Sequence, residues 1–404
     1  MSFGIIEVIT LIMGLSGFSV GTNPKSPTAD QALEYAVPDA DVIAHFDAGA
    51  VIPGNYKVLT NLANQPQIKA SPELAKMVRK AVAEIDGPRG LVKQTVGIDL
   101  TTDVSDATAF VKLVPKQDPN IVVAVHGKFS VITIDKIAKM TGKGAVKSGA
   151  GAWVDTGDGN AVAVTKNGVL LAGTSSLVKD RMADTWKAPG TAGNANLTNA
   201  AEILGQKPVF ALVLTMSQTA RAEALKSVQG QNFATDVLKR HKFAAFAVFK
   251  DGVGWTWIDS SKTGLDAMTQ ISDGFVDLLR AAQIAPRGFA KILMGGLESY
   301  RGTNKQVDDL LRHKADVLKI VDSYTGDGKF QASVNADSKS LKLTVRLTGK
   351  SVSEVLPMGG FLPLAGVFLF AGRAESTPPT MQMPAPAPLP PPPAKKSGAP
   401  AKHP

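Results

Sequence analysis

The strongest constraint on the fold comes from paired apolar segments that are joined by tight turns. The pairs are residues 161–164 with 169–172, 243–249 with 253–258, and 330–334 with 341–347. The first pair is joined through Asn167-Gly168, a dipeptide that favours a tight hairpin turn with positive φ. In the last strand of the third pair, apolar and polar residues alternate. Each pair therefore predicts an antiparallel hairpin with one buried face.

Helical signals lie between the hairpins. Ser71 predicts a helix N-cap and Pro72 a first helical position, and apolar residues then recur on one face as far as Gly87-Pro88. A similar apolar stripe predicts a helix over residues 265–285, and another is expected around residues 307–321. The sequence therefore predicts an α+β fold in which antiparallel hairpin sheets pack against helices.

The order strand, hairpin, strand, helix recurs along the chain, although few residues are identical between the copies. This order predicts a duplicated α+β domain. Residues 189–194 are rich in turn-forming residues and mark the expected seam. We therefore expect a first α+β domain over residues 28–189 and a second over residues 190–354.

The composition excludes several kinds of chemistry. With 404 residues, of which 44% are hydrophobic, the chain is long enough for two domains with real cores. It contains no cysteine, which excludes disulfides, thiolate metal sites and cysteine nucleophiles. The formal charge of +9 includes +3 from the residues after 372, and so small an excess on the body does not indicate nucleic acid.

A hydrophobic segment precedes the body. Residues 3–20 would span roughly 27 Å as a helix, near the lower limit for a bilayer core. We expect residues 1–21 to be a membrane anchor. No Lys or Arg precedes the apolar run as in most signal peptides, but a cleaved signal segment and a buried N-terminal helix are the alternatives. Residues 22–27, with two prolines, form a linker.

A second apolar segment, residues 355–372, runs without charge between Glu354 and Arg373. Its two prolines and four glycines make a poor helix in water but are better tolerated in a membrane, so two interpretations stay open. One is a transmembrane segment, and the other is a buried element that closes the last domain. Residues 373–404 form a proline-rich tail that we expect to be disordered and to act as a spacer or as a peptide ligand.

The sequence contains few groups arranged for catalysis. Asp155-Thr156-Gly157 resembles the active-site loop of aspartic proteases, but such enzymes need a second triplet, which the chain lacks. We therefore expect residues 155–159 to form the turn before the strand at residues 161–164. The histidines are scattered, and His45 and His126 are expected on the half-exposed face of strands. No metal, cofactor or catalytic residue is predicted.

Four lysines suggest a ligand site. Lys136, Lys139, Lys143 and Lys147 recur at a spacing of three to four residues and would line one edge of a helix. They are our candidates for binding an anionic lipid or polymer. The alternative is a solvated charged face.

The layout as a whole, with an N-terminal apolar segment and glycine-turn strands such as residues 167–175, resembles that of bacterial cell-envelope proteins. The resemblance implies a compartment and no activity. We therefore expect a membrane-anchored envelope protein whose periplasmic or extracellular body binds or scaffolds a partner without catalysis. Its partners would be the membrane and a protein that contacts the body or the tail, with no nucleic acid. The alternative is an exported soluble hydrolase with a cleaved N-terminal signal.

Overall fold

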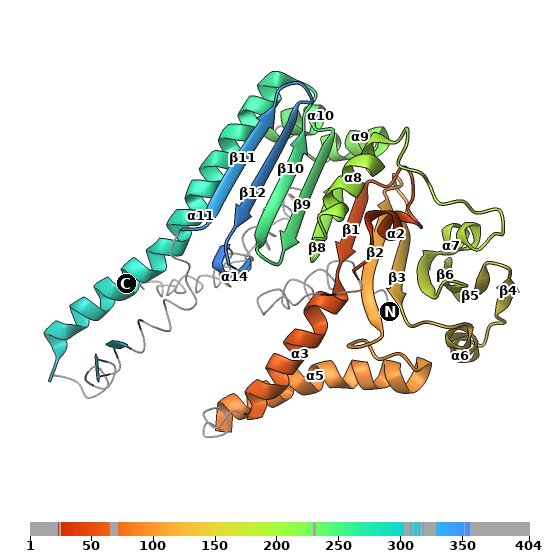
Figure 1. Ribbon diagram of the computed structural model, residues 1–404, viewed down its shortest axis with the longest axis horizontal. Coiled ribbons are helices and arrows are strands. Elements are labelled where there is room, and N and C mark those ends of the chain that lie inside the picture. The colour runs from red at the N-terminus through yellow and green to blue at the C-terminus, as the bar shows by residue number, and fades with distance from the viewer. Residues whose placement is uncertain are drawn as a thin grey trace, which may run out of the picture.

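The computed structural model describes residues 23, 26–64, 72–228, 232–302, 329–350 and 352–355, and a few residues between 308 and 318. The expected anchor, most of the second apolar segment and the proline-rich tail lie outside these residues. Within them, one sheet of twelve strands, in the order β11-β12-β10-β9-β8-β1-β2-β3-β7-β6-β5-β4, runs through the molecule with helices on both faces (Figure 1). All strand pairs are antiparallel, which confirms the α+β class.

The elements have the following bounds. The strands are β1 (Val42–Phe46), β2 (Val104–Lys112), β3 (Asn120–Gly127), β4 (Val146–Ser148), β5 (Gly151–Gly157), β6 (Asn160–Thr165), β7 (Val169–Thr174), β8 (Phe210–Leu214), β9 (Phe243–Phe249), β10 (Gly252–Ile258), β11 (Gln331–Asp337) and β12 (Lys342–Thr348). The helices are α2 (Ala29–Leu33), α3 (Ala48–Asn64), α5 (Pro72–Val96), α6 (Val131–Thr141), α7 (Ser175–Arg181), α8 (Ala195–Gly205), α9 (Gln218–Ser227), α10 (Asn232–Arg240), α11 (Lys262–Leu297) and α14 (Val352–Val355), with a short 3-10 turn η1 (Glu298–Tyr300).

The three predicted hairpins are confirmed as β6-β7, β9-β10 and β11-β12. Gly168 has a φ of 76°, as the Asn-Gly turn before β7 requires. Strict alternation in β12 places Leu343, Val345 and Leu347 in the core. The local turn chemistry and the period of two were therefore sufficient to identify these strands.

Two helices are longer than predicted. α5 continues through Gly87-Pro88 to Val96, and α11 continues twelve residues past its predicted end to Leu297. For α5 the cause is contact on both sides of the break. Asp86 accepts a hydrogen bond from Tyr56 of α3, and Arg89 donates two bonds of 2.9 Å to Asp99. These contacts offset the cost of proline in the helix. Most of residues 307–321, predicted as a helix, lie outside the described residues.

The two faces of the sheet have separate cores. Successive residues of a strand point to opposite faces, so Ala211 and Val213 of β8 pack with α2 and α8, whereas Phe210 packs on the other face with α11. α7 covers the first face beside α2, and α6 covers the second face over β5 and β6. In the described part of the chain, no helix is both long and apolar enough to cross a membrane.

The same order of elements occurs on both sides of the central β1·β8 pair. Outward from β1 lie β2, β3, β7 and β6, and outward from β8 lie β9, β10, β12 and β11. Along the sequence, a helix pair follows the first strand of each series (α3 with α5 after β1, α9 with α10 after β8). One helix follows the third strand (α6 after β3, α11 after β10), and a short helix follows the last strand in sequence (α7 after β7, α14 after β12). Strands β4 and β5 belong to the first series only.

Candidate binding pocket between α9 and the turn after β2

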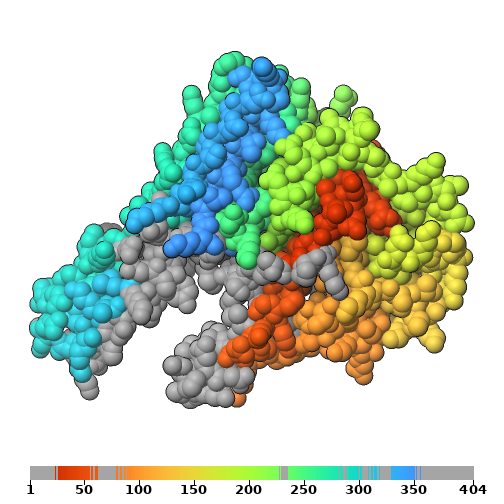
Figure 2. Space-filling model, viewed as in Figure 1, coloured from red at the N-terminus to blue at the C-terminus, as the bar shows by residue number. Residues whose placement is uncertain are grey.

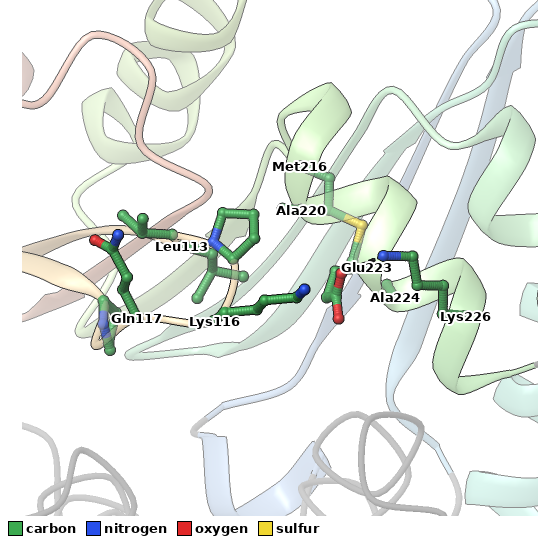
Figure 3. Close-up of a pocket in the computed structure, with 11 residues that line it drawn as sticks. Leu113, Lys116, Gln117, Met216, Ala220, Glu223, Ala224 and Lys226 are labelled. Carbon is green, nitrogen blue, oxygen red and sulfur yellow. Dashed lines mark hydrogen bonds and ion pairs between the residues drawn. The ribbon is translucent and has the colours of Figure 1, made fainter.

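A pocket of about 560 Å³ lies between α9 and the turn that joins β2 to β3 (Figure 3). Its lining residues are Leu113, Val114, Pro115, Lys116, Gln117 and Pro119 from the turn, and Met216, Ala220, Glu223, Ala224 and Lys226 from α9 and the residues before it. Most of these side chains are apolar. The volume is in the range of pockets that bind small molecules.

Asp41 holds the two sides of the pocket together. Its carboxylate is buried and accepts hydrogen bonds from the backbone N–H of Leu113, at 2.8 Å, and of Ser217, at 2.5 Å. Leu113 begins the turn, and Ser217 is the N-cap of α9, where its hydroxyl accepts a bond from Ala220 N–H. Hydrogen bonds to an ionised carboxylate are among the stronger ones in proteins. One side chain therefore fixes the distance between segments that are about one hundred residues apart in sequence.

Both sides of the pocket contain a residue with left-handed backbone. Lys116 has a φ of 59° and Met216 a φ of 41°. Non-glycine residues seldom adopt this conformation, which costs roughly 1–2 kcal/mol. Such residues persist where surrounding contacts fix them, and they are concentrated at functional sites.

The lining combines apolar surface with three charged side chains. Leu113 and Met216 offer apolar surface, and Figure 3 shows Lys116 reaching from the turn toward Glu223 of α9. Glu223 is paired with Lys226 at 2.9 Å. None of the lining residues is a serine, threonine, cysteine or histidine. The pocket can bury an apolar group beside two lysines and one carboxylate.

The pocket also marks a difference between the two halves of the sheet. The β2–β3 turn has seven residues, whereas the β9–β10 turn in the equivalent place has two, Lys250 and Asp251. Asp41 lies directly before β1, and the residue directly before β8 is Val209. The turn and the carboxylate that build the pocket thus occur in one half and not at the matching positions of the other.

The four lysines proposed from the sequence lie in the first half of the sheet, on α6 and near the edge strand β4. They do not line one helix edge as predicted, because α6 ends at Thr141: Lys136 and Lys139 are on α6, Lys143 follows it, and Lys147 is on β4. Lys147 lies 4.0 Å from Asp135, and Lys143 contributes to the lowered pKa of Asp155, after Ser175 and Lys179. Carboxylates are thus near two of the lysines. Their role in binding an anion stays a prediction.

The two strand histidines belong to a polar cluster that the sequence did not reveal. His45 is buried rather than half-exposed as predicted; it bonds Thr108 on β2, and burial lowers its pKa. Nδ1 of His126, which is half-buried as expected, lies 2.8 Å from the buried Asp106. Alternation along β1 and β2 predicts which face of the sheet these residues occupy, but it does not predict how far other parts of the chain bury that face.

Asp47, at the end of β1, joins the N-terminal segment to the same region. Its carboxylate accepts hydrogen bonds from Asn23, at 2.7 Å, and from Ser26, and it caps α3 through Ala50 N–H. This residue is buried. The chain before α2 is therefore fixed to the central strand of the sheet.

Asp155 has a structural role. It lies on β5, and its carboxylate accepts hydrogen bonds from Ser175 and Lys179 of α7. These bonds lower its pKa. The predicted turn over residues 155–159 is shorter than expected: residues 155–157 belong to β5, and only Asp158-Gly159 form the turn into β6. Among the described residues, no three histidine or acidic side chains are grouped so that they could hold a metal ion.

Comparison with known proteins identifies no family. No family model matches the sequence, and no curated protein matches it. Among solved structures, crystal form I of TP0453 is similar with a TM-score of 0.34 and 8% identity, over 87% of this chain and 100% of that one. Crystal form IV of TP0453 has a TM-score of 0.26 and 11% identity, over 56% and 78%. Likeness at this level carries no argument about fold or function.

Proposed function

We propose that this chain is a membrane-associated bacterial envelope protein whose α+β body binds or scaffolds a partner and is not an enzyme. The observation that carries the proposal is the pocket between α9 and the β2–β3 turn. Its lining is mainly apolar, its two sides are joined by the buried Asp41, and its polar groups are suited to orienting a ligand. The partner would insert an apolar group, such as a side chain of a protein, beside Lys116 and Lys226.

Photo-crosslinking in intact cells tests the binding part of this proposal. A benzophenone side chain at position 113, within the pocket, is expected to give a discrete adduct. Ala224→Trp, which fills the pocket, should abolish that adduct. Ala222→Trp, two residues earlier on α9 and exposed outside the lining, should leave it unchanged. An adduct of equal yield in both tryptophan variants would contradict binding at this site.

The membrane part of the proposal rests on the apolar residues 1–21 of the sequence. Carbonate extraction of membranes should leave the full-length chain in the pellet. A variant in which Ile9 and Leu11 are both replaced by Asp should move to the supernatant. Release of the unchanged chain by carbonate would contradict the anchor.

The proposal includes a duplicated plan, with one copy over residues 28–189 and the other over residues 190–354. It is supported by the repeated order of strands and helices on the two sides of the β1·β8 pair. α7 ends at Arg181 and α8 begins at Ala195, so the expected seam falls between them. Limited proteolysis should cut first within residues 183–194. The two fragments should stay associated through β1 and β8, and separation without denaturant would contradict a shared sheet.

A further inference from the structure

Helix α6 carries apolar residues on both of its faces. Ile134 and Ala138 on the inner face are buried against β5 and β6. On the outer face, Ile132 and Met140 are 65% and 63% exposed, and Lys139 lies beside them. Figure 1 places α6 at the outer end of the first half of the sheet, and in Figure 2 this end, coloured orange to yellow, lies at the surface of the molecule.

Positive charge surrounds this outer face. Residues 128–147 contain five lysines and one acidic residue, Asp135. Three of the lysines have a close neighbour: Lys128 lies 3.4 Å from Asp103, Lys147 lies 4.0 Å from Asp135, and Lys136 lies against Gly97. The other two, Lys139 and Lys143, are exposed and form no ion pair within the described part of the chain. The surface thus combines exposed apolar side chains with net positive charge.

An anionic lipid surface suits both of these properties. In helices that lie on a membrane, apolar side chains enter the boundary of the acyl chains while lysines reach the headgroup phosphates. A soluble polyanion would contact the lysines but leave Ile132 and Met140 in water. An apolar groove of a protein would cover Ile132 and Met140 but would remove Lys139 from water without a counter-charge. The combination therefore favours the surface of a membrane.

The expected anchor reaches the fold at the end of the sheet where α6 begins. Asn23 donates a hydrogen bond of 3.3 Å to the carbonyl of Ser105 at the start of β2. The neighbouring Val104 pairs with Gly127, the last residue of β3, and α6 begins four residues later. From Gly127 to Ile132 the chain spans at most about 18 Å. A bilayer that holds the residues before Asn23 is therefore kept close to the first turn of α6.

We propose that the outer face of α6, formed by Ile132, Lys139 and Met140 together with Lys143, is a second membrane contact that lies on anionic headgroups. The contact would fix the orientation of the body on the bilayer. This inference rests on the membrane association in the proposed function. The N-terminal anchor would keep even a weak contact occupied, because tethering raises the local concentration of the lipid surface.

Binding to vesicles tests this surface separately from the anchor. The full-length chain carrying both Ile9→Asp and Leu11→Asp is mixed with vesicles of equal parts phosphatidylcholine and phosphatidylglycerol. It should float with these vesicles, and its affinity for vesicles of phosphatidylcholine alone should be about tenfold lower or less, because the lysines then have no anionic lipid to contact. Absence of binding to the mixed vesicles would overturn the proposal.

Two lysine replacements test the charges. In the same chain, Lys139→Gln combined with Lys143→Gln should weaken binding to the mixed vesicles at least about tenfold, since each lysine near an anionic surface contributes about fivefold. Lys242→Gln combined with Lys262→Gln is the matched control. Both of these lysines are exposed and lie in the second half of the sheet, so their loss should leave binding unchanged. Equal binding by the two double variants would contradict a specific role for α6.

A fluorophore on α6 tests contact with lipid. The chain has no cysteine, so Met140→Cys can be labelled at this position alone with an environment-sensitive dye. Its emission should shift to the blue on the mixed vesicles and not with soluble polyglutamate. Leu278→Cys on α11, where the native side chain is also 63% exposed, is the matched control and should show no shift.

The remaining outcomes separate the alternatives. An unshifted dye at position 140, with polyglutamate binding that depends on Lys139 and Lys143, would assign the surface to a soluble polyanion and overturn the proposal. Failure of the N-terminal anchor would appear instead as release of the unchanged chain by carbonate, so the two failures are distinguishable. Equal thermal unfolding of the variants and the unchanged chain shows that the variants are folded.

Discussion

Ala44 of β1 and Leu212 of β8 lie opposite each other at the centre of the twelve-stranded sheet, in the middle of the five-residue β1·β8 ladder. Residue 42 faces 214 and residue 46 faces 210, so a half-turn about this point exchanges the two strands. The strands beyond them follow in the same order on each side. The two copies of the proposed duplication meet at this central pair, which joins their strands into one sheet.

Replacing Asp41 should loosen the two sides of the pocket. We expect Asp41→Ala to lower the free energy of unfolding by about 2–4 kcal/mol, because two backbone N–H groups lose a buried, charged acceptor. Asp39→Ala is the matched control. Asp39 is exposed and pairs with Lys112, so its loss should cost less than about 1 kcal/mol. Urea unfolding measures both, and equal losses would contradict the role given to Asp41.

Replacing Arg181 should destabilise the contact between α7 and the residues that follow α2. The buried guanidinium donates hydrogen bonds of 2.9 Å to the carbonyls of Tyr35, Leu177 and Ala36, and burial lowers its pKa to about 10. Lysine cannot reach three carbonyls with this geometry. We therefore expect Arg181→Lys to cost about 2–3 kcal/mol in unfolding free energy. Lys187→Arg, on the exposed loop after α7, should have no measurable effect.

The stability of the protein should fall as the pH drops from about 6.5 to 4. Burial lowers the pKa of His241 from 6.5 to about 4, so in this range the unfolded state binds a proton that the folded state excludes. The shift corresponds to about 3 kcal/mol of unfolding free energy, and all of this stability is lost below pH 4. In His241→Gln this part of the pH dependence should disappear. Urea unfolding at pH 7 and at pH 4.5 measures it, and an unchanged pH dependence in the variant would count against the assignment.

Two glycines should respond differently to alanine. Gly173 in β7 has a φ of 145°, and an added Cβ would lie 2.0 Å from the carbonyl oxygen of Ile121 on β3. Gly159 also has a positive φ, 74°, but its Cβ would meet nothing within 4 Å. We expect Gly159→Ala to cost about 1 kcal/mol and Gly173→Ala at least about 3 kcal/mol, because β3 and β7 would be forced apart. Thermal unfolding of both variants measures these two losses of stability.

The sequence predicted the elements better than their assembly. The β6–β7 hairpin was found because its turn and its period of two are local signals. The pairing of β1 with β8 was not predicted, because the contact between two strands separated by over 160 residues gives no local signal in the sequence. The predicted end of α5 at Gly87-Pro88 was wrong because the partners of Asp86 and Arg89, which are Tyr56 of α3 and Asp99 after α5, lie outside this helix. Asp41 was missed because its partner Ser217 is 176 residues away.

The bonds from Asn23 and Ser26 to Asp47 have a mechanical consequence. If the residues before Asn23 are held by a membrane, a pull on the body enters the fold at the end of β1, which is hydrogen-bonded to a neighbour on each side. Load on such a strand is shared by two ladders in shear, whereas load on an edge strand such as β4 or β11 would peel one ladder a bond at a time. The load on the body would thus enter through an inner strand held by two ladders, and force spectroscopy from this point should require more force than from either edge.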